Sequence, residues 1–445
     1  MNNWILGFDK TIVTPADYKE VSYYSAGYAG GCRCTDVLDD MYVRSIWLDD
    51  NSGKGGITFA VIDCVGMSNK DVLDIRSNLK EFSKAVKNRG INILFTHCHS
   101  AVDTQGLWGK LPKTGRVPHY MAELKEKIAK SIVSAFTNKK PGKLFVGDIA
   151  TQGLLEDTRE PVVFDDKLTR ITFKPDDGNL PVTIVHFAVH PEVLGGNNPL
   201  ISADFPSYMG KYIEENIGSE FVFINGAIGG LITCPGLDEI FNKTVDNVLT
   251  CKEYGLKVGK YAVEVGNDIE LKSSIDFIDK KIDMPVSNIK FVLARKFNLV
   301  TNEVLKIKKK PYKYVVPSEL GYLSLGNYLR IMLVPGELYS EIAMGGYLDR
   351  FNSSTGKEMQ GKTLFEMMPD GKKLIFGLCN DELGYIIPEN DFFVHPKLPY
   401  VKNGVDKFGR EHYEETNSIG FYAARTILDA SAIILKKFTS NIEQR

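Results

Sequence analysis

Two histidines stand one residue apart in the segment LFTHCHSAVD, which runs from Leu94 to Asp103. The chain holds only 7 histidines among its 445 residues, so the closeness of His97 and His99 calls for an explanation. An imidazole can ligate a metal ion, transfer a proton near neutral pH, or pack in a core as a hydrogen-bonded group. The pair alone leaves all three roles open.

Further reactive side chains follow other apolar, strand-like segments. VTIVHFAVH ends in His190, EFVFING carries Asn225, LVPGE ends in Glu337, and Tyr385 lies just beyond LIFGLCND. Ligands of α/β sheets usually bind at the carboxyl ends of the strands. Zinc accepts imidazole nitrogen and carboxylate oxygen, and a catalytic zinc site keeps one position open for water. The sequence therefore predicts a zinc site at the rim of a sheet.

Strand geometry predicts which histidines share this site. Side chains at i and i+2 of a strand point to the same face, so we expect His97 and His99 to face one site and Cys98 to be a buried core residue. His186 lies four residues before His190, which is roughly 13 Å along an extended strand. We therefore predict that His186 is a core histidine with a satisfied hydrogen bond.

The elements that must position these residues alternate between β-rich runs and helical patterns, which is typical of an α/β protein. A buried strand is predicted over 57–66, followed by a helix that is capped by Ser68 or Asn69 and ends near Gly90. Other helices are predicted over about 120–136, 205–217 and 419–438. A further helix is predicted to follow the strand YLRIMLVPGE and to end near Phe351. The fold class is thus α/β, with mixed β-sheets covered by helices and an active site at strand carboxyl ends.

Length alone predicts about three domains and also allows one large, two-lobed domain, which is the arrangement that we adopt. We expect residues 1–445 to form a single two-lobed catalytic domain. The stretch of about 270–325 is strand-like and rich in lysine, so it is predicted to be an inserted lobe.

The composition excludes some classes of binding partner and predicts the cellular compartment. With 54 basic and 56 acidic residues, the net charge of -2 provides no field that would attract nucleic acid or an anionic membrane. No apolar run reaches the ~18 residues of a transmembrane helix. The first residues lack the pattern of a secretory signal, and the 7 cysteines are sparse and odd in number. These features predict a cytoplasmic protein without disulfides; they do not predict the oligomeric state.

Seven segments, in order, resemble the N-terminal catalytic domain of the neutral (non-lysosomal) ceramidases. They are GFDKTIVTP, SAGYAGGCRCTDVLDDMYVRSIWL, FTHCHSAVDTQGLWG, EDTREP with FDDKLTRITF, FAVHPEVLGGNNPLISADFPSYM, LVPGE, and GYI with HYEETNS. No single segment is strongly specific, whereas the shared order of all seven is. The chain is accordingly identified as a short, divergent member of that family, without the immunoglobulin-like C-terminal domain of the secreted enzymes.

The resemblance implies a site and a reaction. His97, His190, Glu337 and Tyr385 match the family's zinc ligands, while His99, Arg159 and Tyr413 match residues beside the metal that take part in catalysis. In such enzymes a zinc-bound water attacks an amide carbonyl and releases a fatty acid and an amine. The implied cofactor is Zn²⁺, and the implied partner is a small-molecule or lipid-like substrate.

The chain departs from the family pattern around the substrate. Gly230, in the loop NGAIGGLITCPG, stands where the family has an aspartate, and Ala101 to Asp103 replace the family's continuation after the second histidine. We therefore expect the same hydrolase chemistry on a different amide, with ceramide as one candidate. The alternatives are a metal-retaining protein without hydrolytic activity, in which the Gly229-Gly230 loop marks lost catalysis, and a homologue that cleaves an ester, a lactone or a small amide. Arg159 and Tyr413 also have structural alternatives, as a partner of Glu156 or Asp157 and as a core aromatic.

Overall fold

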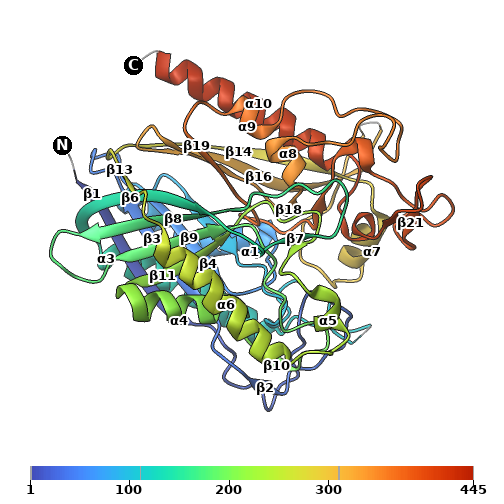
Figure 1. The fold of residues 1–445 in the computed structure, drawn as a ribbon, viewed down its shortest axis with the longest axis horizontal. Helices are drawn as coiled ribbons and strands as arrows, with labels where there is room; N and C mark the ends of the chain where they lie inside the picture. Colours follow the sequence, from blue (N-terminus) through green and yellow to red (C-terminus); the bar gives the residue numbers. More distant parts are fainter. Residues whose placement is uncertain (1–2, 111, 309–310, 444–445) are drawn as a thin grey trace.

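The computed structural model describes residues 3–110, 112–308 and 311–443. Within them the larger sheet has the strand order β11-β9-β8-β6-β1-β3-β4-β5, with β13 paired to β6 (Figure 1). Its strands are β1 (Trp4–Ile12), β3 (Tyr42–Asp49), β4 (Ile57–Ile62), β5 (Ile91–Phe95), β6 (Lys140–Ala150), β8 (Lys167–Pro175), β9 (Val182–Phe187), β11 (Glu220–Asn225) and β13 (Ile269–Leu271). The β4–β5 and β9–β11 pairs are parallel and the others are antiparallel, so the sheet is mixed, as predicted.

The smaller sheet contains most of the region that was predicted to be an inserted lobe. Its order is β14-β16-β17-β19, with β15 paired to β16. The strands are β14 (Ile275–Val286), β15 (Leu305–Lys306), β16 (Tyr314–Leu325), β17 (Leu329–Leu333) and β19 (Lys372–Phe376). The short helix α7 (Ile289–Lys296) lies between β14 and β15 in the chain.

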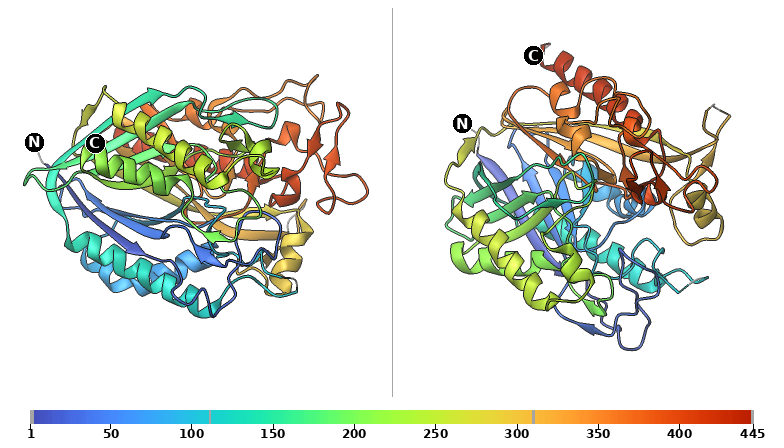
Figure 2. Two further views of the ribbon diagram at one scale, coloured as in Figure 1. Left: turned by 60° about the horizontal axis from the view of Figure 1, so that its bottom comes forward. Right: turned by 45° about the vertical axis from the view of Figure 1, so that its right-hand side comes forward.

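The two sheets form the middle of a four-layer α-β-β-α arrangement (Figure 2). One buried cluster joins the inner faces of both sheets, from Trp4 and Leu6 to Leu374 and Phe376. The outer face of the larger sheet is covered by α1 (Asn69–Asn78), α3 (Pro118–Thr137), α4 (Phe205–Ile217) and α6 (Asn247–Glu264). The outer face of the smaller sheet is covered by α10 (Ala423–Glu443), whose contacts include β14 and β16.

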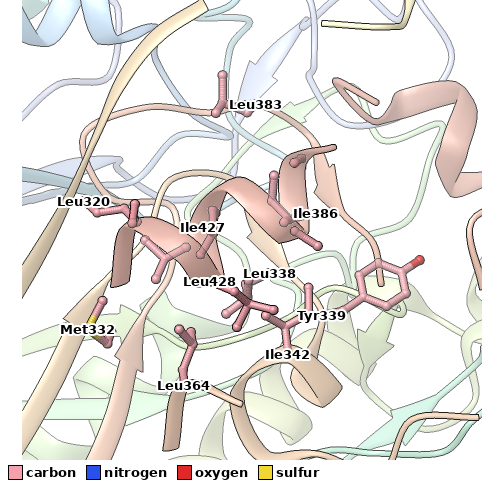
Figure 3. Close-up of a cluster of buried hydrophobic side chains, with 14 of the residues drawn as sticks. Leu320, Met332, Leu338, Tyr339, Ile342, Leu364, Leu383, Ile386, Ile427 and Leu428 are labelled. Carbon is pink, nitrogen blue, oxygen red and sulfur yellow. The ribbon is translucent and has the colours of Figure 1, made fainter. Parts of the chain in front are cut away.

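Leu338 and Ile386 anchor two short strands next to the candidate site residues. Both side chains are fully buried in the core beneath α10, where Leu320, Met332 and Ile427 also pack (Figure 3). They belong to β18 (Glu337–Leu338) and β20 (Tyr385–Ile386), which pair in parallel so that Glu337 lies opposite Tyr385. Because successive strand residues point to opposite faces, burial of Leu338 and Ile386 turns Glu337 and Tyr385 the other way.

Several predicted elements agree with the structure. Helix α4 has the predicted bounds, and Ser68 caps α1 by accepting a hydrogen bond from the backbone N–H of Asp71. The helix predicted from there to Gly90 is broken at Leu79 into α1 and α2 (Lys80–Ala85).

The structure differs from the predicted helices at two places. Helix α6 was not predicted, although Asp246 caps it and its buried positions recur at helical spacing. The helix expected to reach Phe351 is only α8 (Ser340–Met344), which stops where Gly345 and Gly346 take positive φ values. In the described part of the chain, no helix has the length and apolar composition needed to cross a bilayer.

Candidate metal centre

Three histidines that follow the carboxyl ends of two strands of the larger sheet lie close together. His97 and His99 follow β5, and His190 follows β9. Their ring centroids are 4.9 to 5.6 Å apart, and one nitrogen from each ring lies within 4.8 Å of the others. All three side chains are buried. The predicted convergence of His97, His99 and His190 is therefore present in the structure.

The reason given for the pairing of His97 and His99 was wrong. Strand β5 ends at Phe95, so neither histidine belongs to it, and His97 has a φ of 64°, in the left-handed region. A turn, and not strand alternation, brings both rings to the same place. Cys98 is buried as predicted, and its thiol donates to the carbonyl oxygen of Ser202 at 3.2 Å.

Backbone carbonyls orient two of the three rings. Nδ1 of His97 lies 2.7 Å from the carbonyl oxygen of Val65, and Nδ1 of His190 lies 2.8 Å from that of Ile232. A carbonyl can only accept, so each Nδ1 carries the hydrogen and donates. In the neutral form of each ring, Nε2 therefore carries a lone pair that faces the site, which is the arrangement of metal-ligating histidines.

Glu337 faces those two nitrogens. Its Oε2 is 3.1 Å from Nε2 of His190 and 3.5 Å from Nε2 of His97. Burial raises the pKa of the Glu337 carboxyl, but His97 and His190 outweigh burial, and the net pKa is lowered. Tyr385 is buried beside it, and burial followed by the charge of Glu337 raises the pKa of its phenol well above the ordinary value.

The donor set fits a zinc ion. Two imidazole nitrogens and one carboxylate oxygen are the typical protein ligands of a catalytic zinc, and Tyr385 is placed by its strand register to add a phenol oxygen. His99 differs from the other two histidines because neither of its ring nitrogens has a hydrogen-bond partner among the described residues. Burial, followed by the proximity of His97 and His190, lowers the pKa of His99 well below the ordinary value, so its ring is neutral near pH 7.

A cavity of about 270 Å³ opens beside these residues. His97, His99, Glu337, Tyr385 and Tyr413 all line it. Its other walls are partly apolar and partly polar, and include Leu107, Trp108, Phe291, Ala294, Gln105, Lys290 and Thr416. The volume is at the small end of the range for ligand-binding sites.

Tyr413 lines the cavity without being a core aromatic. The residue is 42% exposed, and burial of its phenol raises the pKa to about 12. It immediately precedes the 3-10 helix η2 (Glu414–Asn417). Its hydroxyl is therefore protonated at neutral pH and able to donate a hydrogen bond into the cavity.

Arg159 lies apart from the metal centre, in an ionic cluster. Its guanidinium is bonded to Glu414 at 2.7 Å, to Glu415 at 3.0 Å and to Asp391 at 3.3 Å, and it also donates to the hydroxyl of Tyr339 at 3.0 Å. The side chain is only 8% exposed. The alternative of pairing with Glu156 or Asp157 on a surface loop is also wrong, since only the backbone N–H of Arg159 contacts Asp157.

A second group of ligand-type residues lies in the same cluster. Asp391, Asp406 and His412 could each offer one atom to a cation. However, the Arg410 guanidinium pairs with Asp406 at 2.7 Å and with Asp391 at 3.3 Å. The hydroxyl of Ser354 contacts all three residues. Arg410 and Ser354 thus already provide the charge and the hydrogen bonds that these carboxylates need, and we interpret the cluster as an internal ion network and not as a cation site.

Two buried glutamates beside the histidines were missed. Glu192 accepts a hydrogen bond from the Tyr28 hydroxyl at 2.7 Å and lies 3.6 Å from Nδ1 of His99. Glu382 lies 4.0 Å from Nδ1 of His97, and burial followed by the charge of Glu337 raises its pKa well above the ordinary value. Each stands within three residues of a predicted ligand in the sequence, and that proximity was the available signal.

The Gly229-Gly230 loop packs directly against the strand that carries Glu337. A side chain at Gly229 would place its Cβ 2.4 Å from the Tyr339 ring and 2.6 Å from the Tyr339 backbone nitrogen. Gly230 has a φ of 90°, and a Cβ there would lie 3.3 Å from the Asp157 carboxylate. An aspartate at 230 would therefore face both backbone strain and a like charge.

Comparison with known proteins identifies the fold. No protein-family model matches the chain, and no curated protein matches it by sequence. Among solved structures, the neutral ceramidase from Pseudomonas aeruginosa superposes with a TM-score of 0.74 at 14% identity, over 98% of this chain and 74% of that one. A structure described as ceramidase complexed with C2 superposes with a TM-score of 0.75 at 14% identity, over 99% of this chain and 76% of that one. The chain has the fold of the neutral ceramidases over nearly its whole length.

Proposed function

We propose that the chain is a zinc-dependent hydrolase that cleaves the amide bond of an N-acyl amine. The observation that carries the proposal is the meeting of two oriented histidine Nε2 atoms and the Glu337 carboxylate at the edge of a cavity. The ceramidase fold supports amide hydrolysis as the reaction class. A ceramide-like lipid is one candidate substrate, and a smaller amide is another.

The residues of the chain divide the work as follows. His97, His190, Glu337 and Tyr385 would hold the zinc ion. When bound there, zinc lowers the pKa of water to about 7 and polarises a carbonyl group. The neutral His99 ring, with both nitrogens unpartnered, can take up and return a proton at the reacting atoms. The Tyr413 hydroxyl can donate to the negative charge that develops on the carbonyl oxygen. Arg159 acts at a distance, by holding the segment that carries Tyr413.

Metal analysis of purified variants tests this proposal. We expect about one zinc per wild-type chain, and loss of both zinc and amide hydrolysis in His97→Ala and Glu337→Ala. His119→Ala is the matched control, because His119 is exposed and its partners among the described residues are Asp17 and Tyr23, away from the cavity. Wild-type protein that neither contains nor rebinds zinc would contradict the proposal. Bound zinc without turnover of amides, esters or lactones would favour the non-hydrolytic alternative.

A further inference from the structure

One carboxylate oxygen in the cavity has no hydrogen-bond partner. Glu382 is 6% exposed and lines the cavity. Its Oε1 accepts a hydrogen bond from the backbone N–H of Gly384 at 2.7 Å, whereas its Oε2 is buried and unpaired among the described residues. A buried carboxylate oxygen without a partner is costly, so such an atom in a cavity marks a place for a ligand group.

Glu382 does not serve the metal centre as an orienting group. Its Oε2 approaches Nδ1 of His97 only to 4.0 Å, and that nitrogen already donates to the Val65 carbonyl at 2.7 Å. The nitrogen that faces Glu337 is the other one, Nε2. Glu382 thus stands beside the predicted metal ligands but on a different side of the His97 ring.

The described residues make room for this carboxylate and place no lysine or arginine in ion-pair contact with it. A side chain at Gly66 would lie 2.5 Å from Cβ of Glu382 and 3.1 Å from Nε2 of Gln105, so the glycine allows both to approach. Among the described residues, the one ion-pair geometry of Glu382 is its distant approach to His97. The basic side chain of Lys290 lines the same cavity but makes no recorded pair with Glu382.

We propose that Glu382 binds a cationic ammonium group of the substrate, so that the preferred substrates are small amides carrying a free amine near the scissile bond. An ammonium supplies the missing hydrogen-bond donor, and its positive charge offsets the burial and the Glu337 charge that raise the pKa of the Glu382 carboxyl. The cavity of about 270 Å³ lies at the lower limit of the usual range for ligand-binding sites, which agrees with short acyl and amine parts. This inference rests on the proposed hydrolase function and names its substrate class.

Two matched amides test the selectivity. N-(2-aminoethyl)acetamide and N-propylacetamide differ mainly by an ammonium in place of a methyl group. We expect wild-type protein to prefer the ammonium compound by about 10- to 100-fold in kcat/KM, and Glu382→Gln to lose that preference. Glu319→Gln is the matched control, because Glu319 is equally buried but pairs with Arg76 away from the cavity. Its preference ratio should equal that of wild type.

A binding measurement separates this inference from the proposed reaction. Calorimetric titration with n-propylammonium and with n-propanol needs no turnover, and we expect wild-type protein to bind only the cation, with or without zinc. Selective binding without hydrolysis of either amide would sink the proposed function and keep the Glu382 site. Hydrolysis of both amides without any preference for the ammonium compound would support the proposed function and contradict the Glu382 site. Loss of zinc from Glu382→Gln would assign the residue to the metal centre and overturn the inference. If that variant does not fold, the wild-type titration decides the matter.

Discussion

At the scale of single residues, His97 shows why the site was only partly predictable. Residue types and their order after apolar runs pointed to a wider set that also held His99 and Asn225. The resemblance to the neutral ceramidases then selected the four predicted ligands, His97, His190, Glu337 and Tyr385. The left-handed φ of His97 was not readable from the sequence, since few residues other than glycine and asparagine adopt it. Glu192 and Glu382 were missed because a carboxylate in a loop carries no periodic signal, and its partners come from distant segments.

The pH dependence of zinc binding follows from His190. Burial lowers the pKa of this ring, but its hydrogen bond to Glu337 and the charges of Glu192 and Glu337 together outweigh burial, so the net pKa is raised above its ordinary value. A proton must leave before zinc binds, so the apparent zinc affinity should rise with pH and continue to rise above pH 6.5. Competition with a chromophoric chelator between about pH 5.5 and about pH 8.5 measures this.

Glu337→Gln provides the control for that titration. It removes the acceptor that holds the proton on His190, so the pH at which zinc affinity levels off should move down, even though the affinity itself falls. An unchanged midpoint in this variant would show that Glu337 does not set the protonation of His190.

At the scale of elements, the site depends on short strands and loops that have almost no sequence signature. Helices with a cap and a clear apolar stripe, such as α4, were predicted correctly. The two-residue strands β18 and β20 are too short for periodicity to act, although their pairing sets Glu337 opposite Tyr385. Helix α8 was overestimated, because Gly345 and Gly346 take positive φ values and the helix ends at Met344.

Gly229→Ala tests the packing of the loop against the site. The added methyl group would lie within 2.6 Å of the Tyr339 backbone, so β18 must shift. We expect a loss of about 1–3 kcal/mol in the free energy of unfolding, together with weaker zinc binding. Gly266→Ala is the control, since a Cβ there meets only the Glu264 carbonyl at 3.8 Å. Chemical denaturation and chelator competition measure both effects, and equal results for the two variants would refute the argument.

Arg159→Met tests the ionic cluster that supports Tyr413. Removing this buried guanidinium takes the cation from Glu414 and leaves Glu415 and Asp391 with His412 and Arg410 as their remaining partners, so we expect a loss of about 3–5 kcal/mol in the free energy of unfolding. Arg425→Met, which breaks a more exposed pair with Glu389, should cost about 0–1 kcal/mol. A small effect of Arg159→Met at unchanged zinc content but with reduced turnover would instead indicate a direct part in catalysis.

At the scale of the whole molecule, the two sheets share one core. The alternation of β and α patterns predicted the class of fold, but the packing of the sheets on each other depends on contacts between residues such as Trp4 and Leu374 that no local pattern connects. A peptide break in the loop after β13 (Ile269–Leu271) would leave the strands of the larger sheet on one piece and those of the smaller sheet on the other.

Expression of the two pieces tests how far they depend on each other. Residues 1–272 alone should expose the apolar inner face of the larger sheet and bind a hydrophobic dye, and should hold zinc weakly. Expression together with residues 273–445 should restore burial and zinc binding. A first piece that is folded, free of dye and fully able to bind zinc would contradict the single shared core.

The pairing of β18 with β20, close to histidines that follow strands of the larger sheet, limits how the site can change during evolution. Two of the four predicted ligands come from before residue 191 and two from after residue 336. Recombination that replaced either half with an unrelated sequence would remove two of the four predicted ligands, whereas a change in a loop that does not pack against β18 or β20 would leave all four in place. We therefore expect the substrate selectivity of proteins descended from this one to change before their predicted metal ligands are lost.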